Sequence, residues 1–225
     1  MAELHVLRVF CAPDGSGGNP LGVFLDGGEV PAEERQRVAA ELGFSETVFV
    51  DDAPSGAIRL YTPAEELPFA GHPMVGTAWL LARERAPVEA LRPPAGEVPV
   101  RVEGDLAHAA GRPEWAPGFE FVRVAAPEEV DRVDGPPGGE DMVGVWAWID
   151  EDEGVIRERV FAPGVGIGED EATGAAAVLL GAELGRPLDI HQGLTGSRIS
   201  ARPLDDGMVE IGGRVELEEV REYAA

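Results

Sequence analysis

The second half of the chain repeats the first half, and this repetition constrains the fold more than any other feature of the sequence. Residues 57–85 and residues 156–185 both carry an arginine, an aromatic residue and a proline at alternate positions, followed by a loop and an apolar helical pattern. The matched positions are Arg59 with Arg159, Tyr61 with Phe161, Pro63 with Pro163, and Gly76-Thr77-Ala78 with Gly174-Ala175-Ala176. We interpret the match as an internal duplication. Chance similarity in a chain rich in alanine and glycine is the alternative.

Short runs of alternating residues, separated by turn residues, predict strands around two apolar helices. The predicted elements of the first half are a hairpin over the first 28 residues, a helix at 31–43, strands at 44–50, 57–63 and 97–104, a helix from Val75, and a linker or crossover at 107–118. The helix from Val75 is apolar on most sides, which is typical of a buried helix. If the halves are duplicates, each is a sheet wrapped around a central helix, and we expect function between them.

The composition excludes several classes of partner and chemistry. The formal net charge of -24 makes nucleic acid and anionic membranes poor partners, because affinity for them depends on Lys and Arg. The chain contains no lysine, which excludes Schiff-base chemistry through a lysine. Its single cysteine, Cys11, cannot form an intramolecular disulfide, and no Cys/His spacing of a metal site occurs. No apolar run approaches the roughly 18 residues of a membrane span and no signal peptide is recognisable, so we expect a cytoplasmic protein.

Two polar residues stand at the starts of the two apolar helices. His72 lies between Gly71, which lets the backbone turn tightly towards a ligand, and Pro73 in the first helical turn. The alternative is a histidine that only caps the helix or bonds a neighbouring carbonyl group. Asp170 has the corresponding place in the second half, and its alternative is an ordinary N-cap in a solvated acidic helix start. Two facing helix N-termini would offer N–H groups to a carboxylate substrate.

Glu46 is the most unusual acidic residue of the chain. Strand alternation in the segment FSETVFV places it on the same face as Phe44, Val48 and Val50. Burial among apolar groups raises the pKa of a carboxyl group, which lets the group both take and give a proton near neutral pH. The alternative is a glutamate at a strand end that reaches solvent past its neighbours.

Five motifs, in order, resemble the PhzF-like family, which is named for an isomerase of phenazine biosynthesis and is related in fold to diaminopimelate epimerase. They are VFCAPDGSGGNPLGVFLD with its GGNP, FSETVFV, LPFAGHPMVGTAWLL, RVFAPGVGIGEDEATGAAA and HQGLTGSRI. The resemblance implies an α+β fold of two similar domains, residues 1–110 and residues 111–225. Each domain would be a mostly antiparallel sheet rolled around a central helix, with the active site between them. It also implies a homodimer.

The resemblance further implies proton transfer on a small-molecule substrate without a metal or another cofactor. The general acid/base of the family falls on Glu46. The substrate-binding positions fall on His72, Asp170, Gly71, Asn19, Gly174 and Ala175. A racemase that uses two thiols is excluded, because Ala70 stands where the first cysteine is expected and no cysteine lies near Asp170.

The chain departs from the family pattern at two positions near Asp170. Ala175 replaces the usual serine and Glu171 replaces the usual proline, and the chain is shorter than typical members. We therefore hold two hypotheses. The first is an isomerase that moves a proton on a small carboxylated, amino-bearing metabolite, and the second is a non-catalytic member that binds a metabolite or a partner protein. The sequence does not identify the substrate or the pathway.

Overall fold

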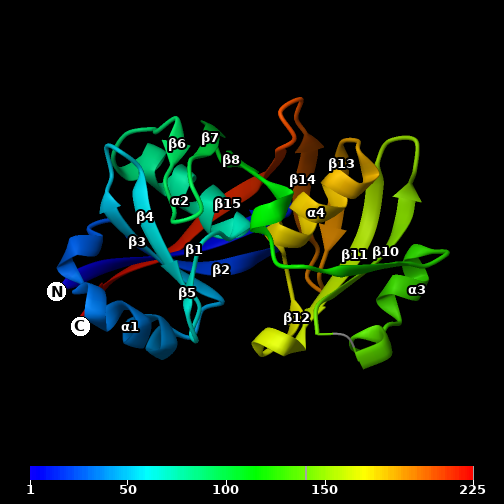
Figure 1. The fold of residues 1–225 in the computed structure, drawn as a ribbon, viewed down its shortest axis with the longest axis horizontal. Helices are drawn as coiled ribbons and strands as arrows, with labels where there is room; N and C mark the ends of the chain where they lie inside the picture. Colours follow the sequence, from blue (N-terminus) through cyan, green and yellow to red (C-terminus); the bar gives the residue numbers. More distant parts are fainter. Residues whose placement is uncertain (140, 225) are drawn as a thin grey trace.

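The computed structural model describes residues 1–139 and 141–224 as a curved sheet around two central helices (Figure 1). The strands of the first half are β1 (Ala2–Cys11), β2 (Gly17–Phe24), β3 (Glu46–Asp52), β4 (Ala57–Tyr61), β5 (Glu66–Leu67), β6 (Ala90–Leu91), β7 (Val98–Glu103) and β8 (Leu106–Gly111). Those of the second half are β9 (Glu120–Arg123), β10 (Val143–Asp150), β11 (Val155–Ala162), β12 (Ile167–Asp170), β13 (Leu188–Gln192), β14 (Ser197–Pro203) and β15 (Val209–Tyr223). The helices are α1 (Arg35–Leu42), α2 (Gly71–Glu84), α3 (Pro127–Asp131) and α4 (Gly174–Leu184), and the short 3-10 turns are η1 (Gly27–Glu29), η2 (Ala32–Glu34), η3 (Pro113–Trp115), η4 (Pro137–Gly139) and η5 (Pro163–Val165).

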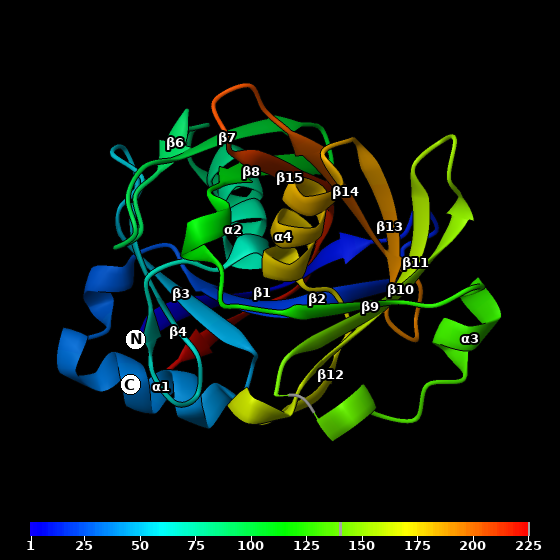
Figure 2. The same ribbon diagram turned by 45° about the vertical axis from the view of Figure 1, so that its right-hand side comes forward.

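Strand β15 joins the two halves of the sheet. Its first residues pair antiparallel with β14, and its last residues pair antiparallel with β1, where Tyr223 lies opposite Ala2. The strand order is β5-β4-β3-β2-β1-β15-β14-β13-β11-β10-β9. The pairs β2 with β3, β9 with β10, and β11 with β13 are parallel, and the other pairs are antiparallel. The predicted α+β class with a mostly antiparallel sheet is confirmed, and α2 and α4 lie side by side inside the curve (Figure 2).

Each half uses the same order of strand, strand, short strand and helix. Strands β3, β4 and β5 form an antiparallel series that leads into α2, and β10, β11 and β12 form the same series before α4. The helices begin at Gly71 and Gly174, so Gly71 corresponds to Gly174 and the predicted match with Gly76 was wrong. The division at residue 110 stays a prediction: this residue lies inside β8, which pairs with β15.

Local sequence explains most of the elements, with two corrections. Helix α2 starts at Gly71, four residues before the predicted Val75. Pro73 fits in the first turn, because the N–H groups of the first turn have no partner within the helix and a proline lacks only such a group. Residues 107–118 are not a linker throughout, since β8 ends only at Gly111. Its alternate residues Ala107 and Ala109 are buried in the main core, and the prediction of a linker did not take this alternation into account.

Three apolar clusters stabilise the sheet. The largest encloses α2 and α4 inside the curve and includes Val48 and Val50 from the inner face of β3. A second lies beneath α1 on the outer face and includes Phe49. The third packs Val130 of α3 against the outer face of β10 and β11. Alternate residues of β3 therefore pack into two different clusters, and this fixes the register of β3 against β2 and β4.

A glutamate is buried inside the second half, where the sequence did not draw attention to it. Glu158 on β11 is 0% exposed and lies opposite Trp146 on one side and Gln192 on the other. Within the described residues, neither of its carboxyl oxygens has a hydrogen-bond partner. Burial raises the pKa of Glu158 to about 8, and the charge of Arg157 opposes this shift only in part. The folded protein therefore holds this carboxyl group protonated at neutral pH.

We expect Glu158→Gln to make the protein more stable at alkaline pH. An unfolded glutamate ionises near its ordinary pKa of 4.5, so the wild type loses stability as the pH rises from that value to about 8. Glutamine has no proton to lose, and the variant should gain on the order of 3 kcal/mol over the wild type by pH 8. Urea unfolding between pH 5 and pH 8 measures the difference, with exposed Glu183→Gln as the control. Parallel stability curves for wild type and Glu158→Gln would contradict the expectation.

Candidate active site

The first turns of α2 and α4 touch each other between the two halves. A Cβ atom built on Gly174 would lie 2.8 Å from the Cα atom of Gly71, and a Cβ atom on Gly71 would lie 2.8 Å from the Cα atom of Gly174. Only glycine allows this approach, so Gly71 serves a contact between helices and not a tight turn. The prediction that the two helix starts face one another is confirmed. Their unsatisfied N–H groups and positive dipole ends converge on one place.

Glu46 and His72 meet at these helix ends. Glu46 begins β3 with a side chain that is 15% exposed, and His72 is the second residue of α2 with a side chain that is 5% exposed. The Nε2 atom of His72 lies 3.5 Å from the Oε2 atom of Glu46. Among the residues that the structure describes, neither atom has a hydrogen-bond partner. His72 does not cap α2, whose N-cap is Ala70.

The predicted face of β3 is confirmed for three residues and wrong for the fourth. Glu46, Val48 and Val50 alternate along β3, and both valines belong to the core around α2. Phe44 precedes the strand and packs against the cluster beneath α1, on the other face of the sheet. The glutamate thus stands at the end of an apolar row, next to the helix ends.

Asp170 is held by side chains from both halves. It ends β12, whereas the N-cap of α4 is Thr173, so the reading of Asp170 as an N-cap was wrong. Its Oδ1 atom accepts a hydrogen bond from Nδ2 of Asn19 at 2.7 Å, and its Oδ2 atom accepts one from Oγ1 of Thr173 at 2.7 Å. Asn19 also donates to the carbonyl of Ala172 at 2.9 Å and accepts from the hydroxyl of Ser45 at 3.3 Å. Asn19 therefore connects β2 to the second half.

Gln192 is a part of the site to which the sequence gave no role. Its Nε2 atom donates to the carbonyl of Asp170 at 2.9 Å and to Oγ1 of Thr173 at 2.8 Å. Its Oε1 atom accepts from the N–H group of Thr173 at 3.0 Å. The signal in the sequence was a buried polar residue at the end of the alternating apolar row Leu188 and Ile190. Gln192 thus fixes the backbone on which Asp170 stands.

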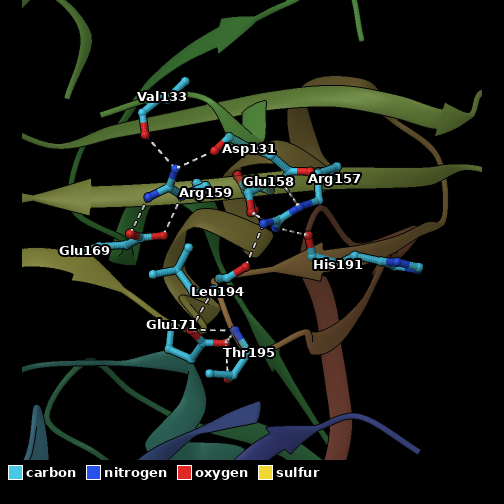
Figure 3. A network of polar contacts seen from close by, with 11 residues as sticks. Asp131, Val133, Arg157, Glu158, Arg159, Glu169, Glu171, His191, Leu194 and Thr195 are labelled. Carbon is cyan, nitrogen blue, oxygen red and sulfur yellow. Dashed lines mark hydrogen bonds and ion pairs between the residues drawn. The ribbon is translucent and has the colours of Figure 1, made fainter. Parts of the chain in front are cut away.

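The acidic residues on either side of this aspartate have partners of their own (Figure 3). The guanidinium group of Arg159 donates two hydrogen bonds to Glu169, at 2.7 and 2.6 Å. Glu171 accepts from the N–H group of Leu194 at 2.8 Å and from Oγ1 of Thr195 at 2.6 Å. The alternative of a solvated acidic helix start was therefore wrong.

Gly174 and Ala175 are the first two residues of α4. Gly174 is buried against α2, and Ala175 is half-buried with only a methyl group as its side chain. The structure brings together six of the predicted site residues: Glu46, His72, Asp170, Asn19, Gly71 and Gly174. The seventh, Ala175, follows Gly174 in α4.

Burial controls the ionisation of the site. It raises the pKa of Glu46 to about 7 and lowers the pKa of His72 to about 4. Burial also raises the pKa of Asp170 to about 6, although the hydrogen bond from Thr173 opposes the shift. At neutral pH the imidazole is therefore uncharged, Asp170 is mainly ionised, and Glu46 exists in both forms. Such a glutamate can act as an acid and as a base in turn.

Neither a metal site nor a membrane span is found in the described part of the chain. Over residues 1–139 and 141–224, no group of three or more His, Cys, Asp and Glu side chains is placed to hold a metal ion. No helix in these ranges is long and apolar enough to cross a membrane.

Comparisons with known proteins identify related sequences. The model of the PhzC-PhzF family, described as phenazine biosynthesis-like protein, matches residues 8–128. The chain is 32% identical over 217 residues to the trans-2,3-dihydro-3-hydroxyanthranilate isomerase of Pseudomonas aeruginosa, covering 78% of this chain and 77% of the relative.

Solved structures show the same fold. A phenazine biosynthesis protein of the PhzF family from Enterococcus faecalis has a TM-score of 0.82 at 22% identity, over 100% of this chain and 99% of the other. A probable proline racemase from Agrobacterium radiobacter has a TM-score of 0.64 at 12% identity, over 100% and 93%. The predicted epimerase-like architecture is confirmed.

Proposed function

The chain belongs to the PhzC-PhzF family of phenazine biosynthesis-like proteins, and on this premise we propose an isomerase that moves a proton on a small carboxylated, amino-bearing metabolite. The reaction needs no cofactor in this proposal, because one residue serves as both acid and base. Ionised Glu46 removes a proton from a carbon next to an activating group, and the protonated carboxyl group returns it at another carbon.

The burial of the Glu46 carboxyl group beside the helix ends is the observation that carries the proposal. Its pKa of about 7 matches the requirement of a group that must gain and lose a proton in each turnover near neutral pH. His72 is a poor candidate for this role, since a pKa of about 4 leaves it a weak base. The neutral imidazole, 3.5 Å from Glu46, can instead hydrogen-bond the substrate beside the reacting carbon.

The other residues of the site would bind the substrate. The N–H groups at the starts of α2 and α4, near Gly71 and Gly174, suit a carboxylate. The ionised carboxylate of Asp170, held by Asn19, suits an amino group. Ala175 offers only a methyl group, which would leave an apolar contact where a serine would donate a hydrogen bond.

The same methyl group favours the alternative of a non-catalytic metabolite-binding or partner-binding protein of this fold. That alternative does not explain Glu46, because a binding protein has no need of a buried carboxyl group with a pKa of about 7. A cytoplasmic location and a homodimer stay predictions.

Incubation in deuterated water separates the two functions. The first probe is trans-2,3-dihydro-3-hydroxyanthranilate, for which the Pseudomonas aeruginosa relative is named, followed by a panel of small amino acids. Calorimetry identifies the compounds that bind, and mass spectrometry and proton NMR detect deuterium attached to carbon. We expect deuterium in at least one compound that binds. Binding without either carbon-bound deuterium or a new isomer by proton NMR, in every compound, would support the alternative and contradict the isomerase.

A further inference from the structure

We propose that Glu171 is a positioning residue, which holds Asp170 and Asn19 in place through a closed ring of hydrogen bonds and peptide bonds that connects the two halves. The ring is a feature of the structure alone, whereas its importance for substrate binding rests on the proposed function. Glu171 stands directly after Asp170 in the sequence, in the segment that leads into α4.

The carboxylate of Glu171 accepts hydrogen bonds from the turn between β13 and β14. It accepts hydrogen bonds from the N–H groups of Leu194 at 2.8 Å and Thr195 at 3.1 Å, and from the hydroxyl of Thr195 at 2.6 Å (Figure 3). A fourth donor is the hydroxyl of Ser197, at 2.9 Å. A carboxylate has about four acceptor sites, so these donors engage the whole group. Glu171 is therefore occupied within the protein and does not face a ligand.

Ser197 extends this cluster to the first half of the chain. Its hydroxyl, which donates to Glu171, accepts a hydrogen bond from the N–H group of Gly18 at 2.8 Å. Gly18 precedes Asn19, whose side chain donates to Asp170 at 2.7 Å. Asp170 precedes Glu171, which closes the circuit. We call these five residues the Glu171 ring.

The turn is shaped around the carboxylate. Gly193 has a φ of 74°, and a Cβ atom built there would collide with the carboxylate of Glu171. The hydrogen bonds to the charged carboxylate of Glu171 are stronger than those between neutral groups. A proline at position 171 would provide none of them. In this chain the hydrogen bonds of Glu171 therefore hold Asp170 in place, where a proline at position 171 would do so by restricting the backbone.

The test reads the position of Asp170 without using any substrate. The variants are Glu171→Ala, which opens the ring, Ser197→Ala, which removes one hydroxyl from it, and exposed Glu183→Ala as a control with the same change of charge. Carbon-13 NMR measures the pKa of the Asp170 carboxyl group, which is assigned by its loss in Asp170→Asn. Amide hydrogen exchange measures the protection of Gly18.

Both ring variants should admit water to Asp170 and lower its pKa by about one unit towards its ordinary value. The amide of Gly18 should exchange about tenfold faster, because its acceptor is moved or lost. A purely structural role would lower the melting temperature of Ser197→Ala without moving the pKa of Asp170, since this variant removes no charge. A pKa of Asp170 in Ser197→Ala equal to that of the wild type overturns the proposal. If Glu171→Ala does not fold, Ser197→Ala decides alone. A failed deuterium experiment would contradict the proposed function and leave these measurements unaffected.

Discussion

Glu46→Gln is expected to abolish the incorporation of deuterium, with a loss of about 10³-fold or more in rate. The amide has nearly the same size as the carboxyl group, and it can neither accept the proton from carbon nor return it. The fold should be retained and should be stabilised at pH 7 and above, because burial opposes ionisation of Glu46 and the amide does not ionise. The rate of exchange by mass spectrometry and the melting temperature of the same samples test both parts.

Exposed Glu65→Gln is the matched control, since it makes the same chemical change on the same half of the protein. It should exchange deuterium at the rate of the wild type. Glu46→Gln retaining most of the activity while folded would rule out Glu46 as the base. The next candidate would then be Asp170, whose pKa burial raises to about 6.

The part of the site that the sequence predicted depends on local periodicity. The burial of Glu46 follows from alternation along a single strand, because Val48 and Val50 turn the same face towards the core. The two central helices follow from their apolar runs, although α2 starts at Gly71, four residues before the predicted Val75. Both signals lie within a few residues of the feature that they predict.

The part that the sequence missed depends on contacts between distant segments. Asn19 reaches Asp170 only because β15 joins the two halves of the sheet and brings β2 next to the segment before α4. Asp170 was read as a possible N-cap because aspartate favours that position. Thr173 has the position instead, and its hydroxyl donates to Asp170 in place of capping the helix. No local pattern distinguishes these two arrangements.

A loss of both stability and activity is expected from Gly174→Ala, because it separates the two helix ends on which the site is built. Replacing glycine by alanine in a helix usually stabilises a protein, yet the added methyl group here would lie 2.8 Å from the backbone of Gly71 and from the N–H nitrogen of His72. Backbone atoms within two helices cannot move aside, so the helices must part, at about 1–3 kcal/mol of stability. A displacement of about 1 Å between Glu46 and the bound substrate would reduce exchange by about 100-fold. Thermal melting and deuterium exchange measure the two losses, and Gly28→Ala, where a Cβ atom meets nothing within 4 Å, should show neither. Wild-type stability in Gly174→Ala would mean that the contact between α2 and α4 is looser than the structure places it.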